Sequence, residues 1–192
     1  NPGLFSEAYG KLPDTMPPNK PSAVTVNPSA YTNAANITVS WSGLTDYNNA
    51  SGSAQTTLSG GQIEYLIDSD SPAGAWKTTG KNTASGSYVF STAGLKDGRH
   101  YIAIRGKDAA GNYGVHNYAY FYLDKTGPTA PVLSVTPASW TNNNTIGLSW
   151  SGITDLNNLK SVEYRLDNGS WVSAGKTDKA FNGLPVDITS LT

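Results

Sequence analysis

The chain of 192 residues contains no cysteine. This absence excludes disulfide bonds, zinc–thiolate sites and thiol nucleophiles together. Charged residues make up only 14% of the chain and the formal net charge is -1, so we expect no basic surface that would attract the backbone of a nucleic acid. No apolar run approaches the ~20 residues that a membrane-spanning helix needs, so membrane insertion is not expected either.

The abundant residues favour short strands joined by turns. The chain has 20 Gly and 11 Pro, and its aromatic residues amount to 10%. Helices would instead require more Ala, Leu, Glu and Lys, whereas turns use Gly, Pro, Asn and Ser. The composition therefore predicts an all-β fold, and the length leaves room for two domains of ordinary size.

One string occurs twice, at a separation of one domain length. Residues 37–46 read ITVSWSGLTD, and residues 146–155 read IGLSWSGITD. Apolar and polar residues alternate in both strings, as in a strand with one buried face. Each string therefore predicts a strand that carries a tryptophan, Trp41 or Trp150, into a core, and the return indicates two copies of one module.

Further alternating segments predict about seven strands in the first copy, the number of an immunoglobulin-like sandwich. They include the segments around 24–26, 63–67, 88–90, 100–105 and 118–123. In 63–67 we expect Ile63, Tyr65 and Ile67 to point inward and Glu64 and Leu66 outward, and Tyr164 is the counterpart of Tyr65. Residues 50–61 are a polar Ser/Gly/Thr stretch that we expect to be a loop.

Three segments follow from these patterns. Residues 1–20 are a Pro-rich linker or the tail of a preceding domain, 21–126 form the first sandwich, and 127–192 form the second. The second copy ends at the turn that precedes the last two strands of the first, so these strands are expected to be absent from the sequence. We expect the chain to be a soluble piece of a longer protein.

A family resemblance enters at the end of the first copy. Residues 97–112 read DGRHYIAIRGKDAAGN, and residues 123–128 read LDKTGP. These strings resemble the ends of bacterial immunoglobulin-like repeats, which look like fibronectin type III domains and stand in tandem in large secreted and cell-surface proteins. The resemblance covers 21–126 well and 127–192 as a truncated copy. It implies two tandem β-sandwiches from an extracellular, bacterial protein, and its motifs say little about function.

The resemblance also suggests a structural role for His100. This residue falls where a tyrosine-corner hydroxyl would hydrogen-bond the preceding turn of a sandwich. We therefore expect His100 to belong to the structural core, together with Trp41, Trp150, Tyr65 and Tyr164. The other histidine, His116, is expected to be a solvated loop residue.

Three tyrosines alternate on the solvent side of the closing strand, and they form the candidate binding site. Tyr118, Tyr120 and Tyr122 are expected beside Tyr101 and Arg105 of the neighbouring strand. Amphipathic aromatic side chains stack on sugar rings or form protein contacts at interfaces. The alternative is ordinary cross-strand packing on a sheet face that meets a neighbouring module.

Oxygen-rich clusters give a weak calcium prediction. Asp46 is followed by two asparagines, as is Asp155 in the second copy, and Asp68 with Asp70 ends a strand. Calcium needs six to eight oxygen ligands, and no EF-hand spacing is present. Asx-turn capping, in which the side chain bonds its own turn, explains the same residues.

The functional prediction is a non-catalytic extracellular module that acts as a spacer or presents a ligand-binding surface for adhesion. No nucleophile motif, phosphate loop or cofactor fingerprint occurs in the sequence. Its expected partners are neighbouring modules of the same chain, and polysaccharide or host matrix protein. Two alternatives stay open: an accessory carbohydrate-binding module of a secreted glycan-active enzyme, and a fibre subunit completed by strands donated from another chain.

Overall fold

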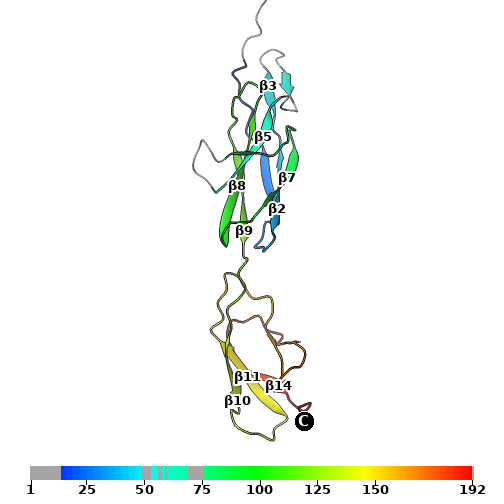
Figure 1. Ribbon diagram of the computed structural model, residues 1–192, viewed down its shortest axis with the longest axis vertical. Coiled ribbons are helices and arrows are strands. Elements are labelled where there is room, and N and C mark those ends of the chain that lie inside the picture. The colour runs from blue at the N-terminus through cyan, green and yellow to red at the C-terminus, as the bar shows by residue number, and fades with distance from the viewer. Residues whose placement is uncertain (1–13, 49–52, 56–57, 59, 69–75, 192) are drawn as a thin grey trace, which may run out of the picture. The chain divides into compact units, whose positions relative to one another are not determined.

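The computed structural model describes residues 14–48, 53–55, 58, 60–68 and 76–191 (Figure 1). All regular structure in these residues is β, which confirms the all-β class. They include no helix, and so none long and apolar enough to cross a membrane. The chain divides into two compact units, Asn1–Leu123 and Asp124–Thr192, which we call unit 1 and unit 2.

Unit 1 is a sandwich of a three-stranded and a four-stranded antiparallel sheet (Figure 1). The strand order is β1-β2-β7 in the first sheet and β6-β5-β8-β9 in the second. This division of seven strands is that of a fibronectin type III-like sandwich. The strands are β1 (Ala23–Asn27), β2 (Asn36–Ser42), β5 (Gln62–Ile67), β6 (Lys77–Thr78), β7 (Gly86–Ser91), β8 (Gly98–Lys107) and β9 (Asn117–Leu123).

The core of unit 1 lies between these two sheets and is built by strand alternation. Alternate residues of β2, among them Trp41, face apolar residues of β5, β8 and β9. The Trp41 side chain is buried, and its indole Nε1 donates a hydrogen bond to the Thr83 carbonyl at 3.1 Å. Gly86 pairs with Trp41, and a Cβ there would lie 2.8 Å from the Trp41 ring. Glycine at this position therefore lets the indole lie close to the β7 backbone.

Part of the segment predicted as a polar loop, residues 50–61, is instead the second strand of a short hairpin. Strands β3 (Asp46–Asn48) and β4 (Ser53–Gln55) pair antiparallel. The prediction was wrong there because each strand has only three residues, too few for alternation to reveal a strand in a sequence. Leu58, in the same segment, is buried in the core of unit 1.

The inward residues of β5 were predicted correctly, but its outward side is less exposed than expected. Ile63, Tyr65 and Ile67 pack into the core. Glu64 and Leu66 point to the opposite face, yet both are buried. Neighbouring side chains on that face cover them, which sequence alternation alone does not reveal.

Unit 2 repeats the first sheet of unit 1, and the first two strands of the two sheets pair in the same register. Val24 pairs with Trp41 in unit 1, and Leu133 pairs with Trp150 in unit 2. The described part of unit 2 contains no counterpart of β8 and β9. Its strands are β10 (Val132–Thr136), β11 (Thr145–Ser151), β12 (Glu163–Tyr164), β13 (Val172–Ser173) and β14 (Phe181–Asp187), in the sheets β10-β11-β14 and β12-β13.

Candidate functional site

The outer face of the β6-β5-β8-β9 sheet carries aromatic and cationic side chains next to one another. The pairing of β8 with β9 sets Tyr101 opposite Tyr120 and Ala103 opposite Tyr118, so these side chains share one face. We call this surface the aromatic face. Its members are Trp76, Arg99, Tyr101, Arg105, Lys107, Tyr113, Tyr118 and Tyr120.

Arg105 is enclosed by its neighbours. Its guanidinium carbon lies 4.1 Å from the Trp76 ring centre and 4.2 Å from that of Tyr113. Arg105 Nη2 and Nε donate to Glu64 Oε2 at 2.8 and 2.9 Å, and Gln62 Nε2 donates to Glu64 Oε1 at 2.9 Å. Cation–π contacts and a charged hydrogen-bonded pair together fix the guanidinium. The structure thus places Arg105 in a packed cluster with Trp76, whereas the sequence placed it beside the tyrosines.

The tyrosines of the aromatic face pack on one another by edge-to-face contacts. Tyr118 meets Tyr101 at a ring-centre distance of 6.1 Å and Tyr120 at 5.4 Å, with interplanar angles of 67° and 74°. Arg99 lies 4.8 Å above the Tyr120 ring. Tyr118 and Tyr120 remain 49% and 43% exposed. The arrangement combines cross-strand packing with two half-exposed phenol rings.

Tyr122 lies on the same side of β9 but is separated from the open part of the face. Its ring packs 5.1 Å from that of Tyr31, and its carbonyl accepts a hydrogen bond from the Thr32 amide at 3.2 Å. The segment before β2 thus covers Tyr122. Trp76 and Tyr113 belong to the aromatic face instead, and the sequence did not identify them as members. Only their spacing from the ends of strands could have suggested them.

His100 lies at an end of the sandwich. Its ring stacks on Phe121 at 5.3 Å, and Nε2 donates to the carbonyl of Lys96, in the preceding turn, at 2.7 Å. Nδ1 pairs with Asp68, whose second carboxylate oxygen accepts the Tyr101 amide at 2.9 Å. Asp68 has a backbone φ of 47°, so this carboxylate fastens a left-handed turn to β8.

Tyr65 and Tyr164 both pack against the core of their unit. In unit 1 the rings of Tyr65 and Tyr88 lie 5.0 Å apart between the two sheets. Burial, together with the hydrogen bond to Tyr88, raises the pKa of Tyr65 to about 12. Its hydroxyl therefore stays protonated throughout the physiological range.

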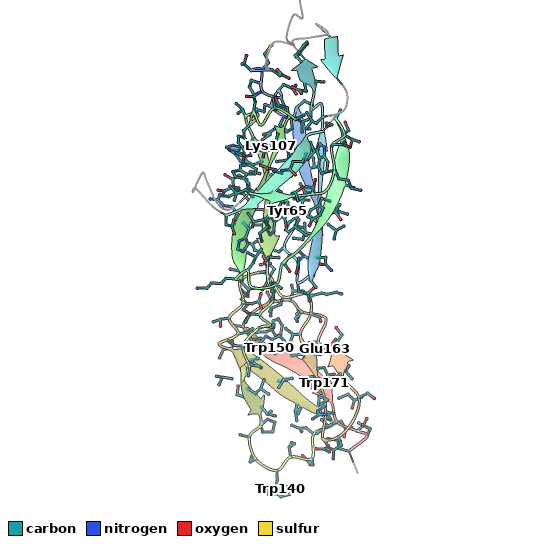
Figure 2. All side chains as sticks on the ribbon, turned by 45° about the horizontal axis from the view of Figure 1, so that its top comes forward. Tyr65, Lys107, Trp140, Trp150, Glu163 and Trp171 are labelled. Atoms are coloured by element: carbon teal, nitrogen blue, oxygen red, sulfur yellow. The ribbon has the colours of Figure 1, made fainter. Side chains whose placement is uncertain are left out.

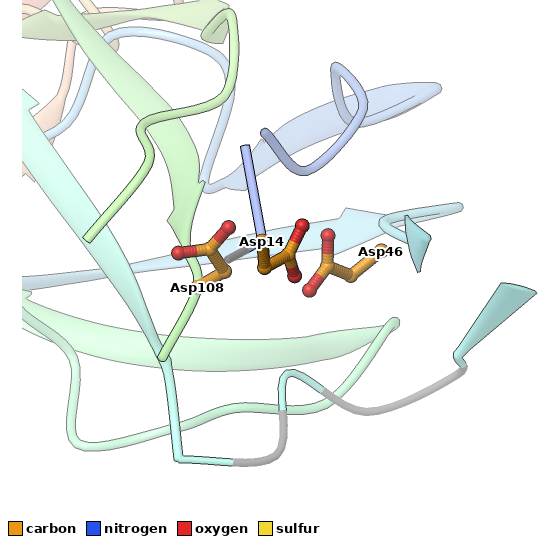
Figure 3. Close-up of side chains that lie close together, drawn as sticks. All are labelled: Asp14, Asp46 and Asp108. Carbon is orange, nitrogen blue, oxygen red and sulfur yellow. The ribbon is translucent and has the colours of Figure 1, made fainter. Parts of the chain in front are cut away.

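Of the calcium candidates, Asp46 alone is brought together with other carboxylates. It is buried beside Asp14 and Asp108, which the sequence reasoning did not single out (Figure 3). The Asp68 carboxylate pairs with His100, as described above. Asp70 lies outside the described residues. The signal that could have found Asp14 is its recurrence, because Asp124 stands at the same distance before a proline in the second copy.

Unit 2 has an open apolar cleft between its two small sheets. Its cavity volume is 590 Å³. The lining includes the strand residues Leu133, Ile146 and Leu148, together with Trp150 and Trp171. Trp171 is 61% exposed, whereas its unit 1 counterpart, Trp76, is partly covered by Arg105.

The second histidine of the chain, His116, belongs to unit 1 and is exposed. Its ring centre lies 5.8 Å from that of Trp76.

The fold therefore defines an all-β protein with a fibronectin type III-like sandwich. A similar solved structure is the crystal structure of the chicken CNTN1 FN1-FN3 domains, with a TM-score of 0.36 and 18% sequence identity. The match covers 89% of this chain and 54% of that chain, so this chain spans about half the length of its neighbour. No family model and no curated protein matches the sequence.

Proposed function

We propose that this chain is a non-catalytic extracellular module that acts as a spacer, holding the parts of a larger protein at a fixed separation. A spacer must resist bending where the chain enters each sandwich. The observation that supports the proposal is that the entering segment is bound to the same loop in both units. This loop follows the tryptophan strand, at residues 43–45 in unit 1 and 152–154 in unit 2.

In unit 1 the entering segment is held through Asn19. The Asn19 amide donates to the Thr45 carbonyl at 3.0 Å, and its side-chain Nδ2 donates to the Gly43 carbonyl at 3.1 Å. The Thr45 amide donates back to Asn19 Oδ1. Further along, Asn117 Nδ2 donates to the Pro21 carbonyl at 3.0 Å, and Pro18 and Pro21 are buried. The segment thus forms part of the sandwich.

In unit 2 a different residue type makes the equivalent bonds. The Thr129 amide donates to the Thr154 carbonyl at 3.0 Å, and the Thr154 amide donates to Thr129 Oγ1 at 2.8 Å. Asparagine and threonine both carry a side-chain acceptor that reaches a backbone amide. The same reciprocal pair in two units favours a structural role for it.

The spacer proposal is tested by ¹⁵N relaxation of the non-proline residues among 14–21 in the whole chain. The expected order parameters are near the ~0.85 of rigid backbone, because hydrogen bonds hold this segment. Asn19→Ala should lower them toward ~0.6, while Asn33→Ala, at an exposed loop position of unit 1, should leave them unchanged. Order parameters below ~0.6 in the unaltered chain would show a flexible linker and refute the proposal.

A second function, an accessory carbohydrate-binding module, is favoured by the half-exposed rings of Tyr118 and Tyr120. Each ring keeps part of its surface available for stacking on a sugar. We expect a Tyr118→Ala, Tyr120→Ala double variant to weaken binding to immobilised polysaccharide roughly tenfold. Tyr47→Ala, which removes a tyrosine of β3 that is 49% exposed, is the matched control. Unchanged binding to polysaccharides and matrix proteins in the double variant would eliminate this role.

A further inference from the structure

We propose that Asp14, Asp46 and Asp108 of unit 1 form a calcium-binding site. Asp14 belongs to the entering segment, Asp46 begins β3, and Asp108 follows β8. The site thus connects the segment that enters the sandwich with two loops at one end of it. It does not depend on the spacer role, because cation binding and segment order are measured separately.

The spacing of the carboxylates fits a shared cation. Figure 3 shows the three side chains next to one another, with the carboxylates of Asp14 and Asp46 turned toward each other. One oxygen from each residue lies within 4.8 Å of the others. Ca²⁺ binds oxygen at about 2.3–2.6 Å, so two ligands on opposite sides of the ion are about 5 Å apart. The three oxygens therefore fit around one ion with little movement.

Asp46 supplies an independent indication of a ligand. Its side chain retains only 8% exposure, and its Oδ1 is buried with no hydrogen-bond partner. A buried carboxylate oxygen without a donor is costly, and such groups are normally paired or coordinate a metal. The protein groups described around Asp46 include two more carboxylates, which can only add repulsion unless a cation lies between them.

Asn112 positions two of the three proposed ligands. Its backbone amide donates to Asp108 Oδ1 and its side-chain Nδ2 donates to Asp108 Oδ2, both at 2.8 Å. Nδ2 also donates to the Asp14 carbonyl at 3.0 Å. Each carboxylate oxygen of Asp108 keeps a second lone pair for a cation. Hydrogen bonds of this kind orient the carboxylates of metal sites.

Two of the three aspartates have counterparts in unit 2. Asp124 occupies the place of Asp14 in the entering segment, and Asp155 occupies the place of Asp46 after the tryptophan strand. Asp124 Oδ1 and Asp46 Oδ1 are the two buried side-chain atoms without a partner among the described residues. Asn157 donates to Asp124 Oδ2 at 3.0 Å and to Asp155 Oδ1 at 2.8 Å. Each unit therefore leaves one buried carboxylate oxygen without a partner, on Asp46 after the tryptophan strand of unit 1 and on Asp124 in the entering segment of unit 2.

The donor set favours calcium over a transition metal. All three groups are carboxylates, and the cluster contains no histidine. Hard oxygen ligands suit Ca²⁺ and Mg²⁺, while zinc and copper sites in proteins use imidazole or thiolate. Mg²⁺ demands octahedral geometry at about 2.0–2.1 Å, whereas Ca²⁺ accepts irregular sites with backbone and water oxygens. A site formed by three separate segments of the chain fits the more tolerant ion.

Without a cation, the cluster should make unit 1 less stable as the pH rises. Burial, and then the charges of Asp108 and Asp14, raise the pKa of Asp46 above its ordinary value of 3.8. The folded state therefore favours protonated Asp46, and the associated stability is present below that ordinary value and is lost as the pH rises through the raised pKa.

The test is a Ca²⁺ titration of the whole chain, followed by ¹H–¹⁵N spectra and calorimetry. We expect binding with Kd of about 10⁻⁴–10⁻³ M, the range of extracellular sites, and amide shifts in residues 14–19, 45–47 and 108–112. Asp46→Asn should abolish these shifts, and in EDTA at pH 7 its urea midpoint should equal or exceed that of the unaltered chain, because one repulsive charge is gone. Glu163→Gln, which removes an exposed carboxylate of unit 2, is the control and should bind like the unaltered chain.

Four results would overturn the proposal. The first is the absence of Ca²⁺ binding at about 10 mM, 10 times the upper expected Kd, and the second is amide shifts confined to other parts of the chain, including Asp124 and Asp155 alone. The third is an Asp46→Asn variant that binds Ca²⁺ with unchanged Kd. The fourth is binding of Mg²⁺ with the same Kd and the same amide shifts as Ca²⁺. Because the variant replaces an oxygen by an isosteric amide, its fold can be verified from the same spectra.

Discussion

Replacing Trp41 by alanine is expected to reduce the free energy of unfolding of unit 1 by about 3–5 kcal/mol. The indole is 3% exposed and lies among the residues that join the two sheets. Its removal leaves a large cavity and also leaves the Thr83 carbonyl without the indole donor. A loss of this size is a large part of the ~5–15 kcal/mol that stabilises an ordinary domain.

Urea unfolding followed by the amide signals of β2 and β8 measures this effect. Trp140→Ala is the matched control, because Trp140 is fully exposed on unit 2 (Figure 2). Its removal should change stability by less than ~0.5 kcal/mol. A loss below ~1 kcal/mol in Trp41→Ala would contradict the central place that the structure gives this side chain.

Replacing Arg105 by alanine should destabilise unit 1 by about 3 kcal/mol or more, although the residue lies on an outer sheet face. Glu64 is 7% exposed and would lose its charged partner. The stacking of the guanidinium between Trp76 and Tyr113 would be lost as well. Arg105→Lys should recover only part of the loss, because an ammonium group cannot reproduce the planar contacts.

A double variant separates the buried charge from the packing. Glu64→Leu combined with Arg105→Met removes both charges and keeps apolar volume, and should be within ~1 kcal/mol of the unaltered chain. Urea midpoints of the single and double variants give the coupling between the two sites. If Arg105→Ala lost less than ~1 kcal/mol, the pair would be an ordinary surface contact and the enclosed cluster would be wrong.

The strands were predictable where one face is apolar and the other polar. The segments that became β2, β5, β8, β9 and β11 were all identified in this way, and in β5 the inward set of Ile63, Tyr65 and Ile67 was predicted correctly. The β3–β4 hairpin was missed because each of its strands has only three residues. Alternation identifies a strand over about four residues or more, so it cannot detect strands this short.

The aromatic face was predictable in part. Alternation placed Tyr101, Tyr118 and Tyr120 on one surface, and the register of β8 with β9 brings them into contact. Alternation could not show that Trp76 and Tyr113 enclose Arg105, because both residues lie outside the regular strands of the sheet. The partners of a loop residue depend on the path of the loop in three dimensions.

The aspartate cluster illustrates the same limit. Asp14, Asp46 and Asp108 come from three distant segments, and each taken alone is an ordinary turn residue. Only the folded chain shows that their carboxylates converge and that an oxygen of Asp46 has no donor. The recurrence of Asp14 and Asp46 as Asp124 and Asp155 was visible in the sequence, but its meaning depends on the fold.

Hydrogen exchange of the five indole N–H groups tests most directly the claim that one tryptophan strand anchors the core of each unit. Trp41 and Trp150 are both 3% exposed, and each donates to a loop carbonyl, at 3.1 and 2.9 Å. Their indole protons should exchange many times more slowly than those of Trp140 and Trp171, which are exposed. Exchange of Trp41 or Trp150 at the rate of Trp140 would contradict the account.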